Sequence, residues 1–135
     1  MARGHPTGDL LEAYDWDLLD EKAGYLRLEA CLPAQLCNSK GQLFGGFTPT
    51  YVDFVAVHTP RAGADRSLPW AIAWLATTSM HVDYFEPVVG PRFLIDSTEE
   101  RRQGRAHFVT TRFFQQDRLA VLALTAMKEP RPPVT

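Results

Sequence analysis

The clearest pattern in the chain is a run of three segments in its C-terminal half in which apolar and polar residues alternate. These segments are rich in β-branched and aromatic residues, which favour strands. Gln103-Gly104 separates the first two, and Gln116-Asp117-Arg118 separates the last two, so short hairpins and an antiparallel meander are predicted. The predicted strands are residues 92–102, 105–116 and 119–129. His107 falls in the second of them and is expected on its solvent side.

Two more strands and two helices are predicted before this meander. Residues 24–33 alternate loosely at period two, and residues 70–87 are rich in Val, Ile, Thr, Trp and Tyr, so each segment predicts a strand. Residues 9–22 place leucines on one helical stripe with acidic residues opposite, which predicts a short amphipathic helix. A second helix is predicted from Thr48, as N-cap, to about His58.

The predicted order is helix, strand, helix and then four strands, which indicates an α+β protein with one long helix lying across one antiparallel sheet. The central segment from Phe47 to Val57 has hardly any polar face, so the sheet must wrap around it. We expect a single domain over residues 1–135, with a core of about residues 20–129 and a frayed tail at 130–135.

Composition narrows the functional classes. The chain has 135 residues, a formal net charge of −2 and 45% hydrophobic residues, so it reads as a soluble globular protein with no basic excess for nucleic acid. No apolar run approaches the roughly 18 residues of a membrane span, and a cytoplasmic location is expected. Cys31 and Cys37 lack a second cysteine pair, so two reduced thiols and no metal site are expected.

The candidate chemistry lies at the central helix. Asp53 is the only formal charge between Lys40 and Arg61, and burying a carboxylate is costly unless it is bonded, paired or used. It could be a catalytic base or nucleophile, or it could simply bond to loop amides or to an arginine. Gly45 and Gly46 precede the helix, where free N–H groups and the helix dipole can hold an oxyanion.

These residues together resemble a known family. The pattern Asn-x-x-Gly-x-x-His-Gly-Gly, with an Asp nine residues after the His, is typical of the hotdog-fold acyl-CoA thioesterases of the phenylacetate-degradation (PaaI) type. The resemblance covers roughly residues 20 to 129 and includes the later strand, Pro-x-x-Gly turn and three-strand finish. The matching positions here are Asn38, Gly41, Phe44, Gly45, Gly46 and Asp53.

The resemblance implies a role for each matching residue. Asp53 would activate water or attack the thioester, while the Gly45 and Gly46 amides would polarise its carbonyl. Asn38 would contact the carbonyl or the water. A hydroxyl from the strand after the helix would complete the site, and the alignment places it at Thr77, or at Thr78 if the register slips by one.

The resemblance also implies an assembly. The family's site forms across a subunit interface, so a homodimer or a dimer of dimers is expected, with Asp53 and Thr77 facing Asn38 and Gly45 of a second chain. Coenzyme A would be the leaving group of an acyl-CoA substrate, and no tightly held cofactor is implied. One departure stands out: Phe44 replaces the family's His beside the substrate.

Three other interpretations compete with a thioesterase. Asp53 and His58 are spaced as in hotdog enoyl-CoA hydratases, although five helical steps of roughly 100° point them about 140° apart. A non-catalytic acyl-CoA-binding module would explain Phe44 but not the carboxylate. A cone-shaped barrel of the kind found in small isomerases and dehydratases would need more helix before the sheet.

Overall fold

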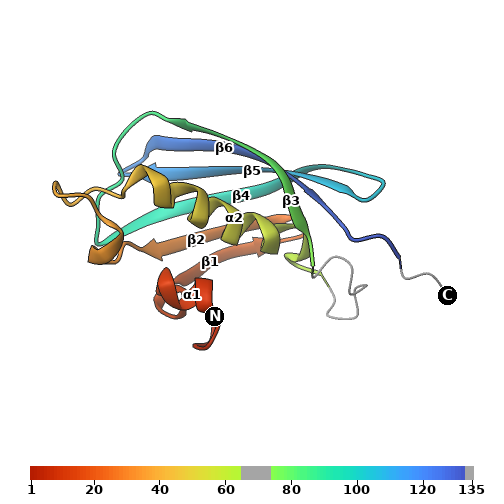
Figure 1. The fold of residues 1–135 in the computed structure, drawn as a ribbon, viewed down its shortest axis with the longest axis horizontal. Coiled ribbons are helices and arrows are strands. Elements are labelled where there is room, and N and C mark those ends of the chain that lie inside the picture. The colour runs from red at the N-terminus through yellow and green to blue at the C-terminus, as the bar shows by residue number, and fades with distance from the viewer. Residues whose placement is uncertain (65–73, 133–135) are drawn as a thin grey trace.

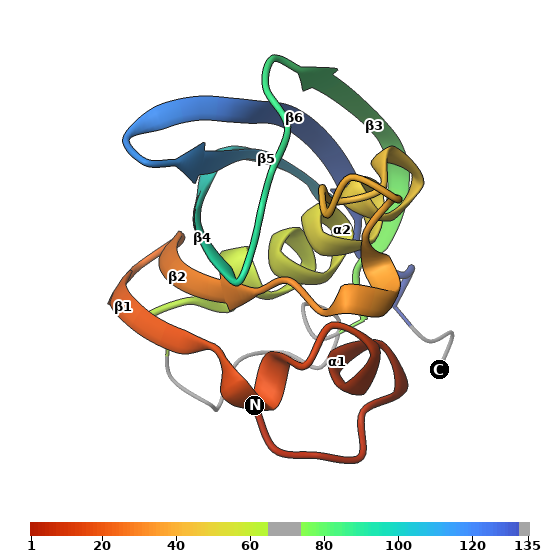
Figure 2. The same ribbon diagram turned by 90° about the vertical axis from the view of Figure 1, so that its left-hand side faces the viewer.

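A six-stranded antiparallel sheet curls around one helix in the computed structural model, which describes residues 1–64 and 74–132 (Figures 1 and 2). The strand order is β1-β2-β4-β5-β6-β3, and every neighbouring pair is antiparallel. The strands are β1 Asp17–Lys22, β2 Tyr25–Cys31, β3 Ala76–Tyr84, β4 Arg92–Gln103, β5 Ala106–Gln115 and β6 Arg118–Lys128. The predicted α+β architecture, including the hairpins of the C-terminal meander, is therefore confirmed.

The central helix α2 runs from Thr48 to His58, as the sequence predicts. A 3₁₀ turn, Gly45–Phe47, leads into it, and a second one, Thr59–Arg61, follows it. The predicted N-cap is one residue off, because Phe47 is the capping residue and Thr48 is already helical and buried. Pro49 suits the first turn, where its missing N–H costs nothing.

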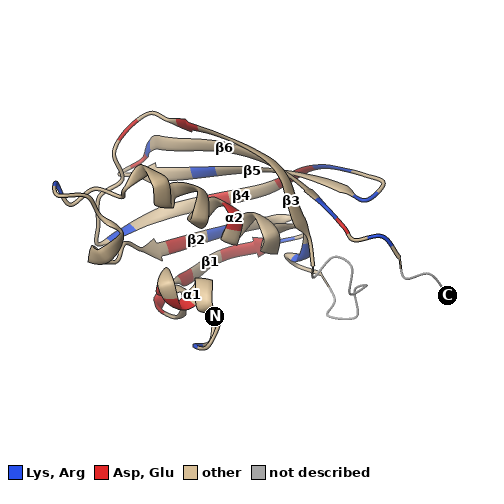
Figure 3. Ribbon diagram, viewed as in Figure 1, with Lys and Arg blue, Asp and Glu red and all other residues tan. Residues whose placement is uncertain are grey.

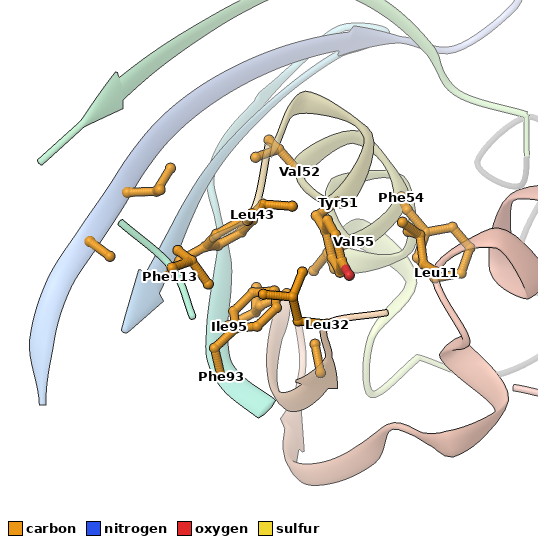
Figure 4. Packing of buried hydrophobic residues seen from close by; sticks show 14 of the residues in the cluster. Leu11, Leu32, Leu43, Tyr51, Val52, Phe54, Val55, Phe93, Ile95 and Phe113 are labelled. Atoms are coloured by element: carbon orange, nitrogen blue, oxygen red, sulfur yellow. The ribbon is translucent and has the colours of Figure 1, made fainter. Parts of the chain in front are cut away.

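The core lies between α2 and the concave face of the sheet. Tyr51, Val52 and Val55 of α2 are buried there, and Figure 4 shows them facing Phe93 and Phe113 of the sheet. Full burial of such side chains stabilises a fold by about 1.5–3 kcal/mol each. The Tyr51 hydroxyl donates to the Cys31 carbonyl oxygen over 2.7 Å, and burial raises the pKa of this phenol.

The prediction of an N-terminal helix over residues 9–22 is wrong. The segment instead holds a short helix α1, Pro6–Leu10, a 3₁₀ turn, Ala13–Asp15, and the strand β1. The Ala23-Gly24 turn, with Gly24 at φ +68°, returns the chain so that β1 pairs with β2. Backbone pairing with a neighbouring strand outweighs the helical spacing of the leucines, two of which, Leu18 and Leu19, are exposed on this edge strand.

Strand β3 forms the other edge of the sheet. It begins at Ala76, later than predicted, and residues 70–73 lie outside the described part of the chain. It pairs with β6 on one side only, and nearly all its residues are exposed. A long exposed edge like this is a pairing surface unless something covers it.

His107 is fully buried, which corrects its predicted place on the solvent side of β5. Both faces of this strand carry apolar residues, so alternation alone did not distinguish them. The ring lies between two carboxylates: Nδ1 is 3.1 Å from Glu99 Oε2, and Nε2 is 2.5 Å from Glu129 Oε2. These contacts tie β4, β5 and the end of β6 together.

Among the helices that the structure describes, none is both long and apolar enough to cross a bilayer.

Candidate active site

Asp53 lies on α2 and meets a hydroxyl of β3. The Thr77 hydroxyl donates to its Oδ1, while no arginine or lysine pairs with it among the described residues. It is the single acidic band on α2 in Figure 3. The sequence predicts burial for this carboxylate, but within one chain Asp53 is exposed, because its carboxylate turns to the Thr77 hydroxyl of the edge strand β3 and away from the core.

A β-bulge decides which hydroxyl meets Asp53. Thr77 pairs with Met127 and Ser79 pairs with Ala126, so Thr78 is an extra residue with no opposite partner. The Thr78 hydroxyl turns back to the Ala126 carbonyl oxygen, 3.1 Å away. Bulges commonly re-aim side chains next to functional sites. Of the two candidate threonines, the structure therefore brings Thr77 to the carboxylate.

Asp53 and Thr77 form part of the wall of an open groove of about 570 Å³. Volumes of this size are typical of small-molecule sites. The groove runs between α2, β3 and the N-terminal segment, and its lining mixes apolar and polar side chains. The lining residues are His5, Thr7, Pro49, Thr50, Asp53, Phe54, Val57, His58, Leu75, Thr77 and Met80.

His58 lines the same groove at the C-terminal end of α2. Its Nδ1 lies 2.8 Å from the Phe54 carbonyl oxygen, so this nitrogen carries the proton in the bonded tautomer and leaves Nε2 free as an acceptor. Burial lowers the pKa of His58, although the bond to the Phe54 carbonyl opposes that shift. Helical geometry predicts that the side chains of Asp53 and His58 point in different directions from α2, yet both line the same groove.

Gly45 and Gly46 form the 3₁₀ turn at the other end of α2. Neither N–H finds an acceptor among the hydrogen bonds of the described chain. The Tyr84 hydroxyl, at the end of β3, donates to the Gly45 carbonyl oxygen over 2.8 Å. No sequence pattern pointed to this contact, because its residues lie 39 positions apart.

A Cβ atom at Gly46 would lie 2.9 Å from the ring of Phe44, so the second glycine lets this aromatic side chain fold over the turn. The Phe44 ring itself is more than half exposed. Asn38 closes the preceding loop, with its Oδ1 accepting from the amides of Lys40 and Gln42 at 2.9 and 3.1 Å.

The predicted site residues thus fall into two groups. Asp53 and Thr77 share the groove, whereas Asn38, Phe44, Gly45 and Gly46 lie at the start of α2 and do not line it. Asp53 lies seven positions after Gly46, which is about 10 Å along the helix axis. One chain alone therefore does not bring the glycine amides to the carboxylate.

No three His, Cys, Asp or Glu side chains converge as metal ligands in the described ranges.

The sequence matches no protein-family model, and no curated protein matches it. Solved structures do match. A putative thioesterase from Ralstonia eutropha, a phenylacetic acid degradation-related protein, superposes with a TM-score of 0.76 at 17% identity, covering 94% of this chain and 92% of that one. Zebra fish thioesterase superfamily member 2 gives 0.76 at 19% identity, with coverages of 96% and 88%.

A third match is a hypothetical thioesterase from Streptococcus pneumoniae solved with coenzyme A. It gives a TM-score of 0.70 at 12% identity, covering 85% of this chain and 88% of that one. All three identities are low, so they establish the architecture and not the activity. The fold of the protein is the hotdog fold.

Proposed function

We propose that this hotdog protein is an acyl-CoA thioesterase, which hydrolyses the thioester of an acyl- or aryl-CoA to the free acid and coenzyme A. The observation that carries the proposal is the carboxylate of Asp53, held by the Thr77 hydroxyl at the wall of a ligand-sized groove and not neutralised by any cation in the described residues. The coenzyme A in the S. pneumoniae structure supports the substrate class.

In the proposed reaction Asp53 acts as the base for water or as the nucleophile. Negative charge then develops on the carbonyl oxygen, and the unbonded amides of Gly45 and Gly46 are suitable donors for it. Coenzyme A leaves as the thiol. Thr77 orients the carboxylate through its hydrogen bond.

The two halves of this site would meet through a second copy of the chain. The exposed edge of β3 offers unpaired backbone groups along its length, and Thr77 and Tyr84 both lie on it. Pairing two chains along β3 would bring the glycine turn of one chain toward the carboxylate of the other. Homodimers and dimers of dimers both satisfy this arrangement, and Asn38 would then approach the partner's groove.

The direct test is a panel of acetyl-, octanoyl-, dodecanoyl-, benzoyl- and phenylacetyl-CoA, assayed for release of free thiol. Turnover of at least one of them is expected. If all bind and none releases thiol, the protein is the acyl-CoA-binding module that Phe44 would suit, and the thioesterase proposal fails.

Enoyl-CoA hydration is the second candidate reaction, because Asp53 and His58 line one groove. Crotonyl-CoA therefore belongs in the same panel, with loss of its enoyl absorbance as the readout. Hydration that is faster than any thiol release would favour the hydratase.

Tyr84→Phe is expected to lower kcat by about three- to tenfold and to leave KM nearly unchanged, the loss of one neutral hydrogen bond. The Gly45 carbonyl and the Gly46 N–H belong to one planar trans peptide and point in opposite directions. The Tyr84 bond to that carbonyl therefore fixes the direction of the Gly46 donor. Only the transition state needs this donor, so the effect falls on kcat.

The matched control is Tyr25→Phe, which removes a hydroxyl that bonds to Asp96, away from the groove. Its kinetic constants should equal those of the wild type. A Tyr84→Phe enzyme with unchanged kcat, or with a raised KM alone, would contradict a role in aiming the amide.

A further inference from the structure

A second groove, of about 480 Å³, lies on the other side of α2, between the helix and the β1–β2 hairpin. Its buried lining is apolar, whereas its charged residues, Glu21 and Arg61, are exposed. The main apolar lining residues are Trp16, Leu18, Leu26, Leu28, Phe54 and Val55. The apolar side chains suit a hydrocarbon group, while Glu21, His58 and Arg61 add a polar part to the lining.

The N-terminal segment builds one wall of this apolar groove. The Trp16 ring stacks on Tyr51 at a centroid distance of 5.7 Å, and its indole nitrogen donates to the Leu11 carbonyl oxygen over 3.0 Å. Figure 4 shows Phe54 pointing toward Leu11, away from the sheet. The groove is therefore formed within one chain, by ordered side chains on both sides.

Phe54 and His58 line both grooves. They are one helical turn apart on α2, and their rings lie 5.1 Å apart. These two rings form the partition between the carboxylate groove and the apolar groove. Asp53 and Phe54 both line the carboxylate groove, so the partition borders the groove in which the proposed reaction takes place.

We propose that the apolar groove receives the acyl chain of the substrate past the Phe54–His58 partition, and that the substrates are medium-chain or longer acyl-CoAs. This inference rests on the proposed thioesterase function. A thioester bound at Asp53 has to place its acyl group away from coenzyme A. An acetyl group would leave the groove empty, while each added methylene that enters it strengthens binding by about fourfold.

The test is the chain-length profile of kcat/KM over acetyl-, hexanoyl-, octanoyl- and dodecanoyl-CoA. In the wild type kcat/KM should rise by up to about fourfold per methylene until the groove is full. Leu28→Trp replaces an aliphatic side chain with a bulky indole ring in the groove. It should lower the ratio of octanoyl to acetyl kcat/KM by about tenfold or more. Leu18→Trp is the second filling variant, since Leu18 is exposed and tolerates a larger side chain.

Leu94→Trp is the matched control, because Leu94 lies on β4 with its side chain on the opposite face from the core residues Phe93 and Ile95. Its profile should match that of the wild type. Unchanged profiles in folded Leu28→Trp and Leu18→Trp, or an equal shift in the control, would overturn the acyl groove.

The experiments distinguish an error in the acyl-groove proposal from an error in the thioesterase proposal. If the wild type hydrolyses no acyl-CoA, the thioesterase is wrong, and the groove is then tested by equilibrium binding of octanoyl- and acetyl-CoA. A preference for octanoyl-CoA that Leu28→Trp removes supports the groove without catalysis. Equal binding of both ligands, or a preference that Leu28→Trp leaves intact, overturns it.

Discussion

Asp53→Asn is expected to lower kcat for thioester hydrolysis by about 10²- to 10⁴-fold, the range for losing a general base. The amide keeps an oxygen that can accept from Thr77, and Asp53 is exposed in the chain, so the fold should not change. The loss therefore measures the charge and basicity of the carboxylate. Thiol release from the best substrate of the panel gives the rate, and a thermal melt checks the fold.

Asp20→Asn is the matched control for this variant. Asp20 is a solvent-accessible carboxylate of β1, at the opposite edge of the sheet, paired with Lys22 over 3.5 Å and outside both grooves, so its loss should leave the rate unchanged. A soluble Asp53→Asn enzyme that turns over at the wild-type rate would remove Asp53 from the mechanism.

The same variant tests the proposal that a second chain completes the site. Co-expression of Asp53→Asn chains with Gly46→Pro chains, which lack the Gly46 N–H donor, would give mixed dimers in which one site carries both defects and the other neither. With random pairing, activity should recover to about one quarter of wild type. No recovery in proven mixed dimers would place the whole site within one chain.

His107→Leu is expected to cost about 3–5 kcal/mol of folding free energy, the usual result of removing one partner from a buried ionic cluster. The ring is fully buried and contacts Glu99 and Glu129, whose side chains are only 12% and 18% exposed. A neutral imidazole has one N–H, so a second proton is needed for both contacts to be hydrogen bonds. Without the ring, the Glu99 and Glu129 side chains lose the partner that they share.

The measurement is the melting temperature, with an expected fall of about 10 °C or more. His81→Gln is the control, because His81 pairs with Asp83 on the surface, where such a pair contributes about 0–1 kcal/mol. Adding Glu99→Gln and Glu129→Gln to His107→Leu should restore part of the loss. Equal melting of His107→Leu and His81→Gln would contradict the buried cluster.

The parts of the fold that sequence predicts are those with strong local signals. Helix α2 has proline in its first turn and Pro60 just past its end, and the β4–β5 and β5–β6 turns have glycine or two residues at positive φ. In the N-terminal segment Gly24 marks a turn, but residues 17–22 before it do not alternate as a strand would. The leucines of this segment fit a helix, and only pairing with β2, a tertiary effect, makes residues 17–22 a strand.

In the candidate site, too, the residues with a strong local signal in the sequence could be predicted. Asp53 stands out because it is the only charge in an apolar helix, and the glycine pair marks the turn before it. The choice of Thr77 over Thr78 could not be made from the sequence, because it depends on the bulge in β3. The role of Tyr84 could not be predicted either, because its contact with Gly45 forms only in the folded chain. The exposure of Asp53 could not be predicted, since it depends on how the free edge of β3 lies beside α2.

The extra residue at Thr78 makes the length of β3 decide which hydroxyl reaches Asp53. With it, the chain offers one threonine to the carboxylate and one to the neighbouring strand. Deletion of Thr78 would remove the bulge and leave Thr77 and Ser79 as adjacent residues on opposite faces of the strand. The register of β3 would then change, and with it the direction in which the Thr77 hydroxyl points, although Asp53 and Thr77 would both remain. During divergence, insertions and deletions in β3 should thus be rarer than substitutions.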